Sequence, residues 1–287
     1  MYEIFDSHAH IYPDKIAEKA SVAIGKFYDI PMDCNGSVEG LLKVGKEGNV
    51  TRYLVHSVAT STHQVGSINR FILGEMNKHP EFIGFMTLHQ DLTEEEIEQE
   101  VNFCVENGFS GIKLHPDFQK FAIDSDEARK MYDIVGEKLP ILFHTGDKRY
   151  HYSHPTQLAR IAREYPKMRF IGAHFGGYSC WTESEQAYKG LDNVFFDTSS
   201  SLAFLSKEEA TRLIHSMGAE KFFFGSDYPM WTPKEEEERF LALDLTERER
   251  ENIFAQNLKQ FLNMVICQTK CNTFLIQDQT NLQQICS

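Results

Sequence analysis

The feature of this 287-residue sequence that most constrains its fold is one pattern repeated eight times. Each repeat begins with a short run of β-branched and aromatic residues and continues through a longer amphipathic stretch. The short runs are apolar on both faces, as parallel strands are when helices cover both sides of their sheet. We predict strands at residues 3–8, 52–57, 82–88, 111–115, 140–144, 169–174, 193–197 and 221–227.

Helix starts are marked between these runs by capping boxes, in which a hydroxyl side chain and a carboxylate three residues later satisfy free backbone amides. The pairs are Thr93 with Glu96, Ser206 with Glu209, Thr232 with Glu235 and Thr246 with Glu249. The interval between the first two strands is longer than the others, and residues 37–48 predict an extra helix there.

Eight strand–helix units favour a (β/α)8, or TIM-type, barrel, which takes about 250 residues. The alternative is a doubly wound open sheet, which normally has a glycine-rich turn after its first strand. This chain has Ser7-His8-Ala9-His10 at that position, so the barrel is preferred. We expect one barrel domain over residues 1–265. Residues 266–287 have no capping pattern, and we expect a C-terminal extension, either poorly ordered or docked, to which the sequence assigns no role.

The charge of the chain restricts its partners. Lys and Arg number 29 against 42 Asp and Glu, a net charge of −13, and no basic stripe is visible. Nucleic acids and anionic membrane surfaces are therefore excluded as expected partners. No apolar run reaches the length of a membrane span, and the first residues do not resemble a signal peptide. The six cysteines include no Cys-x-x-Cys pair, so we predict free thiols and a cytoplasmic protein.

The predicted strand ends are rich in histidine, and the carboxyl ends of the strands are where barrel enzymes place their active sites. The residues at these ends are His8, His10, His56, His89, His115, His144, His174, Asp197 and Asp227. His8 and His10 are two apart on one strand, so their side chains point to the same face. Imidazoles together with a carboxylate suit zinc or a similar divalent ion. Without a metal, so many polar rings at one barrel mouth would be costly to bury.

Four ordered motifs resemble the amidohydrolase superfamily, in its amidohydrolase-2 (amidohydrolase-related) branch. They are Asp-Ser-His-Ala-His at 6–10, Phe-His-Thr-Gly at 143–146, Ala-His-Phe-Gly-Gly at 173–177 and Gly-Ser-Asp-Tyr-Pro at 225–229. The branch includes metal-dependent hydrolases and decarboxylases such as aminocarboxymuconate semialdehyde decarboxylase. The resemblance implies that His8, His10, His144 and Asp227 are metal ligands, and that His174 orients or polarises the attacking water or the substrate. It also implies that a homodimer is one assembly to consider.

The fourth predicted strand differs from the two-metal members of the superfamily in a way that affects the metal count. Those members carry a carboxylated lysine there as a bridging ligand, and this chain has Lys113 and His115 on one face. In the branch that the chain resembles, a single metal is the usual expectation, with zinc as the first choice. We therefore expect an unmodified Lys113 that is hydrogen-bonded inside the barrel or touches a substrate oxygen, with His115 beside it.

Two reactions are compatible with such a site on a small-molecule substrate. The preferred one is hydrolysis of a small carboxylate, amide, ester or lactone, in which the metal lowers the pKa of a water to about 7 and Asp227 moves the proton. The alternative is decarboxylation of an aromatic or unsaturated carboxylic acid, which needs a cation for the carboxylate. Arg149 is a candidate for that cation, and Trp181 for a pocket wall. A non-catalytic metal-binding barrel is a third reading, which the presence of both Asp227 and His174 opposes.

Overall fold

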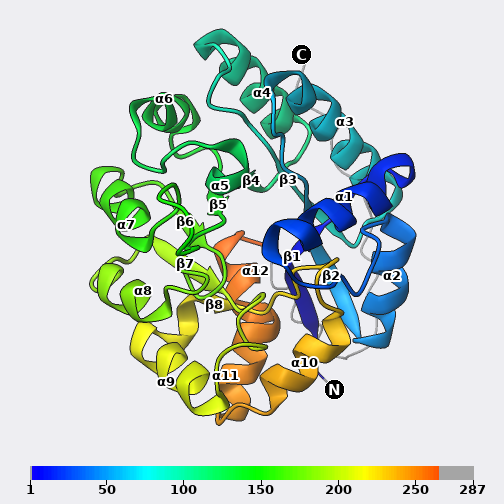
Figure 1. Ribbon diagram of the computed structural model, residues 1–287, viewed down its shortest axis with the longest axis vertical. Coiled ribbons are helices and arrows are strands. Elements are labelled where there is room, and N and C mark those ends of the chain that lie inside the picture. Colours follow the sequence, from blue (N-terminus) through cyan, green and yellow to red (C-terminus); the bar gives the residue numbers. More distant parts are fainter. Residues whose placement is uncertain (1, 265–287) are drawn as a thin grey trace, which may run out of the picture.

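The computed structural model describes residues 2–264, and they form a single ring of eight parallel strands in the order β1 to β8 (Figure 1). The strands are β1 (Ile4–His10), β2 (Val50–His56), β3 (Phe82–Met86), β4 (Gly111–Leu114), β5 (Ile141–Phe143), β6 (Phe170–Gly172), β7 (Val194–Asp197) and β8 (Phe222–Phe223). Backbone hydrogen bonds close the ring between β8 and β1. The amide of Asp227 donates to the carbonyl of His8 at 2.9 Å, and the amide of His10 donates to the carbonyl of Tyr228 at 2.8 Å. The predicted (β/α)8 barrel is confirmed. The predicted extension at 266–287 lies outside the described residues.

Helices surround the ring of strands (Figure 1). They are α1 (Asp14–Tyr28), α2 (Val38–Glu47), α3 (Thr62–Lys78), α4 (Glu94–Glu106), α5 (Pro116–Gln119), α6 (Asp126–Val135), α7 (Pro155–Glu164), α8 (Trp181–Ala187), α9 (Lys207–Met217), α10 (Pro233–Leu241), α11 (Glu247–Glu251) and α12 (Asn257–Phe261), with a 3-10 turn η1 (Ala219–Lys221) and a π-helical turn η2 (Asn252–Gln256). The predicted capping boxes form in full at Thr93, Thr232 and Thr246. At Ser206 the hydroxyl accepts from the amide of Glu209, which is the first half of a box. The extra helix predicted at 37–48 is α2.

Most strand ends differ from the prediction by one or two residues, and the differences at β1 and β8 shape the barrel mouth. β1 continues through His10, two residues beyond its predicted end. β8 stops at Phe223, although the sequence predicts a strand to residue 227. The reason is that the amide of Ser226 donates to the buried carboxylate of Asp6 at 2.9 Å, and Asp227 takes a positive φ of 62°. Regular strand pairing thus ends at Phe223, and the backbone turns at Asp227.

The barrel interior is apolar at one end. Phe5, Leu54, Phe85 and Phe223 pack there in one buried cluster, and α12 closes the same end with Leu258 and Phe261. This packing leaves the opposite end, at the carboxyl termini of the strands, for the polar residues. Among the described residues, no helix is long and apolar enough to cross a membrane.

Candidate active site

Three of the predicted ligands converge at the barrel mouth. Nε2 of His8 lies 3.3 Å from Nε2 of His10 and 3.4 Å from Oδ1 of Asp227, and the remaining side of this triangle, from His10 to Asp227, is 3.6 Å. Donor atoms at about 2.0–2.1 Å from a tetrahedral metal ion lie about 3.3 Å from each other. The triangle therefore fits one divalent ion.

Burial keeps the two imidazoles in the form that can bind a metal. Desolvation lowers the pKa of His8 well below its ordinary value and that of His10 to about 3. Both rings are therefore neutral at physiological pH, and a neutral imidazole has the nitrogen lone pair that a metal needs. The donor set of two nitrogens and a carboxylate oxygen is suited to zinc, manganese or a similar ion.

Asp197 at the end of β7 determines the tautomer of His8. Its Oδ2 lies 2.8 Å from Nδ1 of His8, and a carboxylate can only accept, so Nδ1 carries the proton and Nε2 keeps its lone pair. The other oxygen of Asp197 accepts from the amides of His174 and Ser199 at 2.9 and 3.1 Å. The sequence places Asp197 at a strand end, but this orienting contact was not predicted.

A second chain of hydrogen bonds determines the tautomers of His174 and His144. Nδ1 of His174 lies 3.1 Å from the carbonyl oxygen of Ser199, so this nitrogen must carry the proton. Nε2 of His174 then accepts from Nδ1 of His144 at 3.1 Å, which leaves the lone pair of His144 on its Nε2. That atom lies 3.5 Å from the hydroxyl of Tyr28 and 3.6 Å from Asp117.

His144 is thus in the form that could bind a metal, but its contacts differ from those of the other predicted ligands. Among the described residues its polar side-chain contacts are with His174, Tyr28 and Asp117, and not with His8 or His10. It stacks on His115, with ring centroids 4.0 Å apart. The predicted ligands thus form two groups, which meet where the rings of His8 and His174 lie 5.1 Å apart, and His10, His144 and Asp227 line one cavity.

Lys113 lies inside the barrel, as expected, with its Nζ 3.1 Å from Nε2 of His8. It is fully buried, and desolvation lowers its pKa to about 8. The amine of Lys113 thus lies directly beside the His8–His10–Asp227 triangle.

Tyr28, the last residue of α1, was not predicted as part of the site. Its hydroxyl lies 2.9 Å from Nε2 of His115, and its side chain lines the same small cavity as Lys113 and Asp227. The sequence has no local signal for this contact, since Tyr28 is far in the chain from β4 and β5. Helix α1 thereby covers part of the barrel mouth.

Two predicted substrate-binding residues do not line this cavity. Arg149 is paired with Asp147 at 2.7 Å, and its guanidinium lies 4.8 Å from the centre of the Phe27 ring. The indole of Trp181 donates to the carbonyl of His174 at 3.2 Å, so it supports the β6 end rather than forming a pocket wall. Among the residues that line the cavity, Lys113 is the one with a lysine or arginine side chain.

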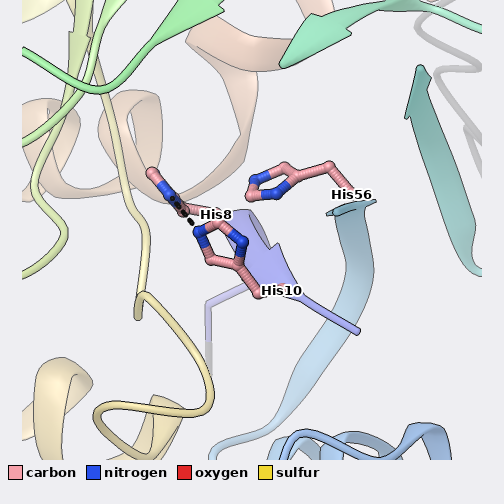
Figure 2. A group of neighbouring side chains, drawn as sticks. All are labelled: His8, His10 and His56. Atoms are coloured by element: carbon pink, nitrogen blue, oxygen red, sulfur yellow. Dashed lines mark hydrogen bonds between the residues drawn. The ribbon is translucent and has the colours of Figure 1, made fainter. Parts of the chain in front are cut away.

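His56, at the end of β2, lies beside two of the predicted metal ligands, which its position in the sequence did not indicate. Figure 2 shows its ring facing those of His8 and His10, and the three residues offer ligand atoms within 4.8 Å of one another. His56 is fully buried, and neither of its ring nitrogens has a hydrogen-bond partner among the described residues. A metal-binding histidine has a buried nitrogen without a hydrogen-bond partner when its ion is not bound, so His56 is a candidate ligand.

The fold and these contacts define a (β/α)8-barrel protein with a buried histidine–carboxylate site at the carboxyl ends of its strands. Residues 5–263 match the family model described as amidohydrolase. The chain belongs to the amidohydrolase family, as its motifs indicated. No curated protein matches the chain in sequence.

Solved structures with the same fold include several related barrels. An uncharacterised TIM-barrel protein from Bordetella bronchiseptica is 15% identical with a TM-score of 0.77, over 91% of this chain and 98% of that one. The 5-carboxyvanillate decarboxylase of Sphingomonas paucimobilis is 12% identical with a TM-score of 0.72, over 92% and 99%. A dihydroxybenzoic acid decarboxylase from a Polaromonas species, solved with bound manganese and an inhibitor, 2-nitroresorcinol, is 14% identical with a TM-score of 0.71, over 92% and 97%. At these identities the likeness concerns the fold.

Proposed function

We propose that the protein is a metal-dependent decarboxylase of an aromatic or unsaturated carboxylic acid. The observation that carries this proposal is the position of the buried Lys113 amine, whose Nζ lies 3.1 Å from His8 Nε2, beside three atoms with metal-ligand spacing. A decarboxylase must hold a carboxylate, and this arrangement supplies an amine that can bind it inside the cavity. The decarboxylases among the structural neighbours support the same choice over the hydrolysis that the sequence favoured.

The residues that would hold the metal are His8, His10 and Asp227, with His56 as a further imidazole beside them. The family resemblance adds His144. A divalent ion bound there supplies Lewis acidity, which draws electron density from an oxygen that it contacts. Manganese and zinc both accept nitrogen and carboxylate ligands, so both are tested below.

Side chains of the protein then bind the substrate carboxylate and transfer the proton. The Lys113 amine binds the carboxylate of the substrate. When the bond between the carboxyl carbon and the body of the substrate breaks, its electron pair remains on the body and carbon dioxide leaves. Asp227 relays one proton from solvent to that carbon, so the reaction consumes one carboxylate and one proton and yields one hydrocarbon C–H and carbon dioxide. Asp227 is held for this role because its Oδ2 accepts from the hydroxyl of Ser200, which itself accepts from the indole of Trp231 at 3.1 Å.

Hydrolysis is the second candidate, and the size of the cavity favours it. The cavity beside Asp227 and Lys113 measures about 30 Å³, which admits a water-sized reactant. In that case Asp227 accepts the proton of the attacking water and passes it to the leaving group, and Lys113 polarises the carbonyl oxygen.

The test is to supply the purified protein with manganese or zinc and to offer 2,6-dihydroxybenzoate, 5-carboxyvanillate, a lactone and an aryl ester separately. Metal-dependent release of carbon dioxide supports the decarboxylase, and production of acid without carbon dioxide supports the hydrolase and overturns the first proposal. A protein that binds no metal would overturn both. In the Lys113→Met variant we expect the metal content to be kept and the turnover of carboxylate substrates to fall about 100-fold or more.

A further inference from the structure

The cavity at the metal site is too small for the body of an aromatic or unsaturated acid. It measures about 30 Å³, whereas a cavity that binds benzene measures about 150 Å³. The site can therefore enclose the reacting group of a substrate, while the remainder of the molecule needs a neighbouring space.

Such a space adjoins the site between α1 and α3. It is a groove of about 630 Å³, within the range of small-molecule pockets, which is roughly 300–1,000 Å³. Ile16, Ala20 and Ala23 line it from α1, and Ile68 and Phe71 line it from α3. Its surface is mainly apolar, so it suits hydrocarbon rather than a charged group.

The groove shares lining residues with the cavity at the metal site. His10, Ile24 and Phe118 line both the groove and the small cavity. His10 is one of the three converging metal-type ligands, so the groove reaches a residue of the metal site. A ligand with its polar end beside His10 and Lys113 would therefore extend its body outward between the two helices.

We propose that this groove is the binding site for the apolar body of the substrate, and that the substrate is a carboxylic acid carrying a hydrocarbon or aryl body of several carbons. This inference rests on the proposed function, because that function places the carboxylate at Lys113. Each methylene that enters the groove leaves water, and its burial strengthens binding by about threefold to fourfold. Affinity should therefore rise with body length until the groove is filled.

The chain offers a matched pair of variants on α1. Ala23 lines the groove, and Ala23→Phe places an aromatic ring in it. Val22 is the adjacent residue, 45% exposed, and it lines a different surface depression, so Val22→Phe adds the same ring outside the groove. Circular dichroism and thermal unfolding confirm that both variants are folded.

The experiment is calorimetric titration of the manganese-loaded protein with acetate, butyrate, hexanoate and octanoate. We expect the wild type and Val22→Phe to bind more tightly with each added methylene, and Ala23→Phe to lose this gain while keeping its affinity for acetate. Lys113→Met should weaken all four acids by the same factor. Affinity that does not depend on chain length in the wild type, or an Ala23→Phe series identical to that of the wild type, would overturn the inference. Affinities for the four acids that Lys113→Met leaves unchanged would also overturn it, because the groove would then bind its ligands apart from the metal site.

The titration tests the groove independently of the carbon dioxide assay, which tests the proposed function. Binding of saturated acids does not require their decarboxylation, so the titration can succeed when no carbon dioxide is released. The carbon dioxide assay can likewise succeed when the groove variants show no effect.

Discussion

The Oδ2 atom of Asp197 lies 2.8 Å from Nδ1 of His8, and both side chains are fully buried. This contact joins the end of β7 to β1, the second strand along the ring, past the short β8. Because the carboxylate can only accept, it directs the lone pair of His8 toward His10 and Asp227. One hydrogen bond thus orients a candidate ligand without touching the metal position.

Asp197→Asn is expected to lower metal affinity by about 10- to 100-fold. The Oδ1 position is retained by the amides of His174 and Ser199, so the new NH2 group would face His8 Nδ1. An NH2 group donates, and His8 would then carry its proton on Nε2, where it cannot bind a metal. Competition with a chelator measures the affinity. Unchanged affinity would show that Asp197 does not set the tautomer.

Asp227→Asn is expected to keep much of the metal but to lose turnover by about 100-fold or more, because the amide cannot relay a proton. His8 and His10 remain to hold the ion, with their Nε2 atoms 3.3 Å apart. Metal analysis and steady-state rates on the same preparation separate the two effects. Full activity in this variant would remove Asp227 from the reaction.

His56→Leu is expected to lower metal affinity about tenfold, since its imidazole has no other hydrogen-bond partner among the described residues and offers a ligand atom near those of His8 and His10. The matched control is His89→Leu, which removes a buried imidazole whose Nδ1 already accepts from the amide of Asp91 at 3.3 Å. Chelator competition and the visible spectrum of the cobalt-loaded protein report on the ligand set. Equal effects of the two variants would assign His56 to packing alone.

Glu236→Gln is expected to change how stability depends on pH. Burial raises the pKa of Glu236 to about 8 in the folded protein, against an ordinary value of 4.5. The folded state therefore holds this proton more tightly, and the wild type loses the resulting stability as pH rises from 4.5 to 8, by at most about 1.4 kcal/mol per pH unit. Glutamine stays neutral, so the variant should gain in melting temperature relative to the wild type as the pH rises from 5 to 8. Glu238→Gln, an exposed position on the same helix, should show no such trend.

The sequence by itself determined the number and order of the strands, the barrel class and most helix starts. Period-2 and period-3.6 patterns specify which face of an element is buried, and hydroxyl–carboxylate pairs specify where helices begin. The same rules bring His8 and His10 to one face of β1. The motifs then identified the family, which the match over residues 5–263 confirms.

Only the tertiary structure decided how the side chains beyond the strand ends meet. His174 and Asp227 both have a positive φ, of 60° and 62°, so strand alternation no longer predicts where their side chains point. His8 and Asp197, which are hydrogen-bonded, are 189 positions apart in the sequence. Tyr28, which enters the cavity, is 87 positions from its partner His115. Such contacts depend on the closure of the barrel and on the path of the loops, which local patterns do not encode.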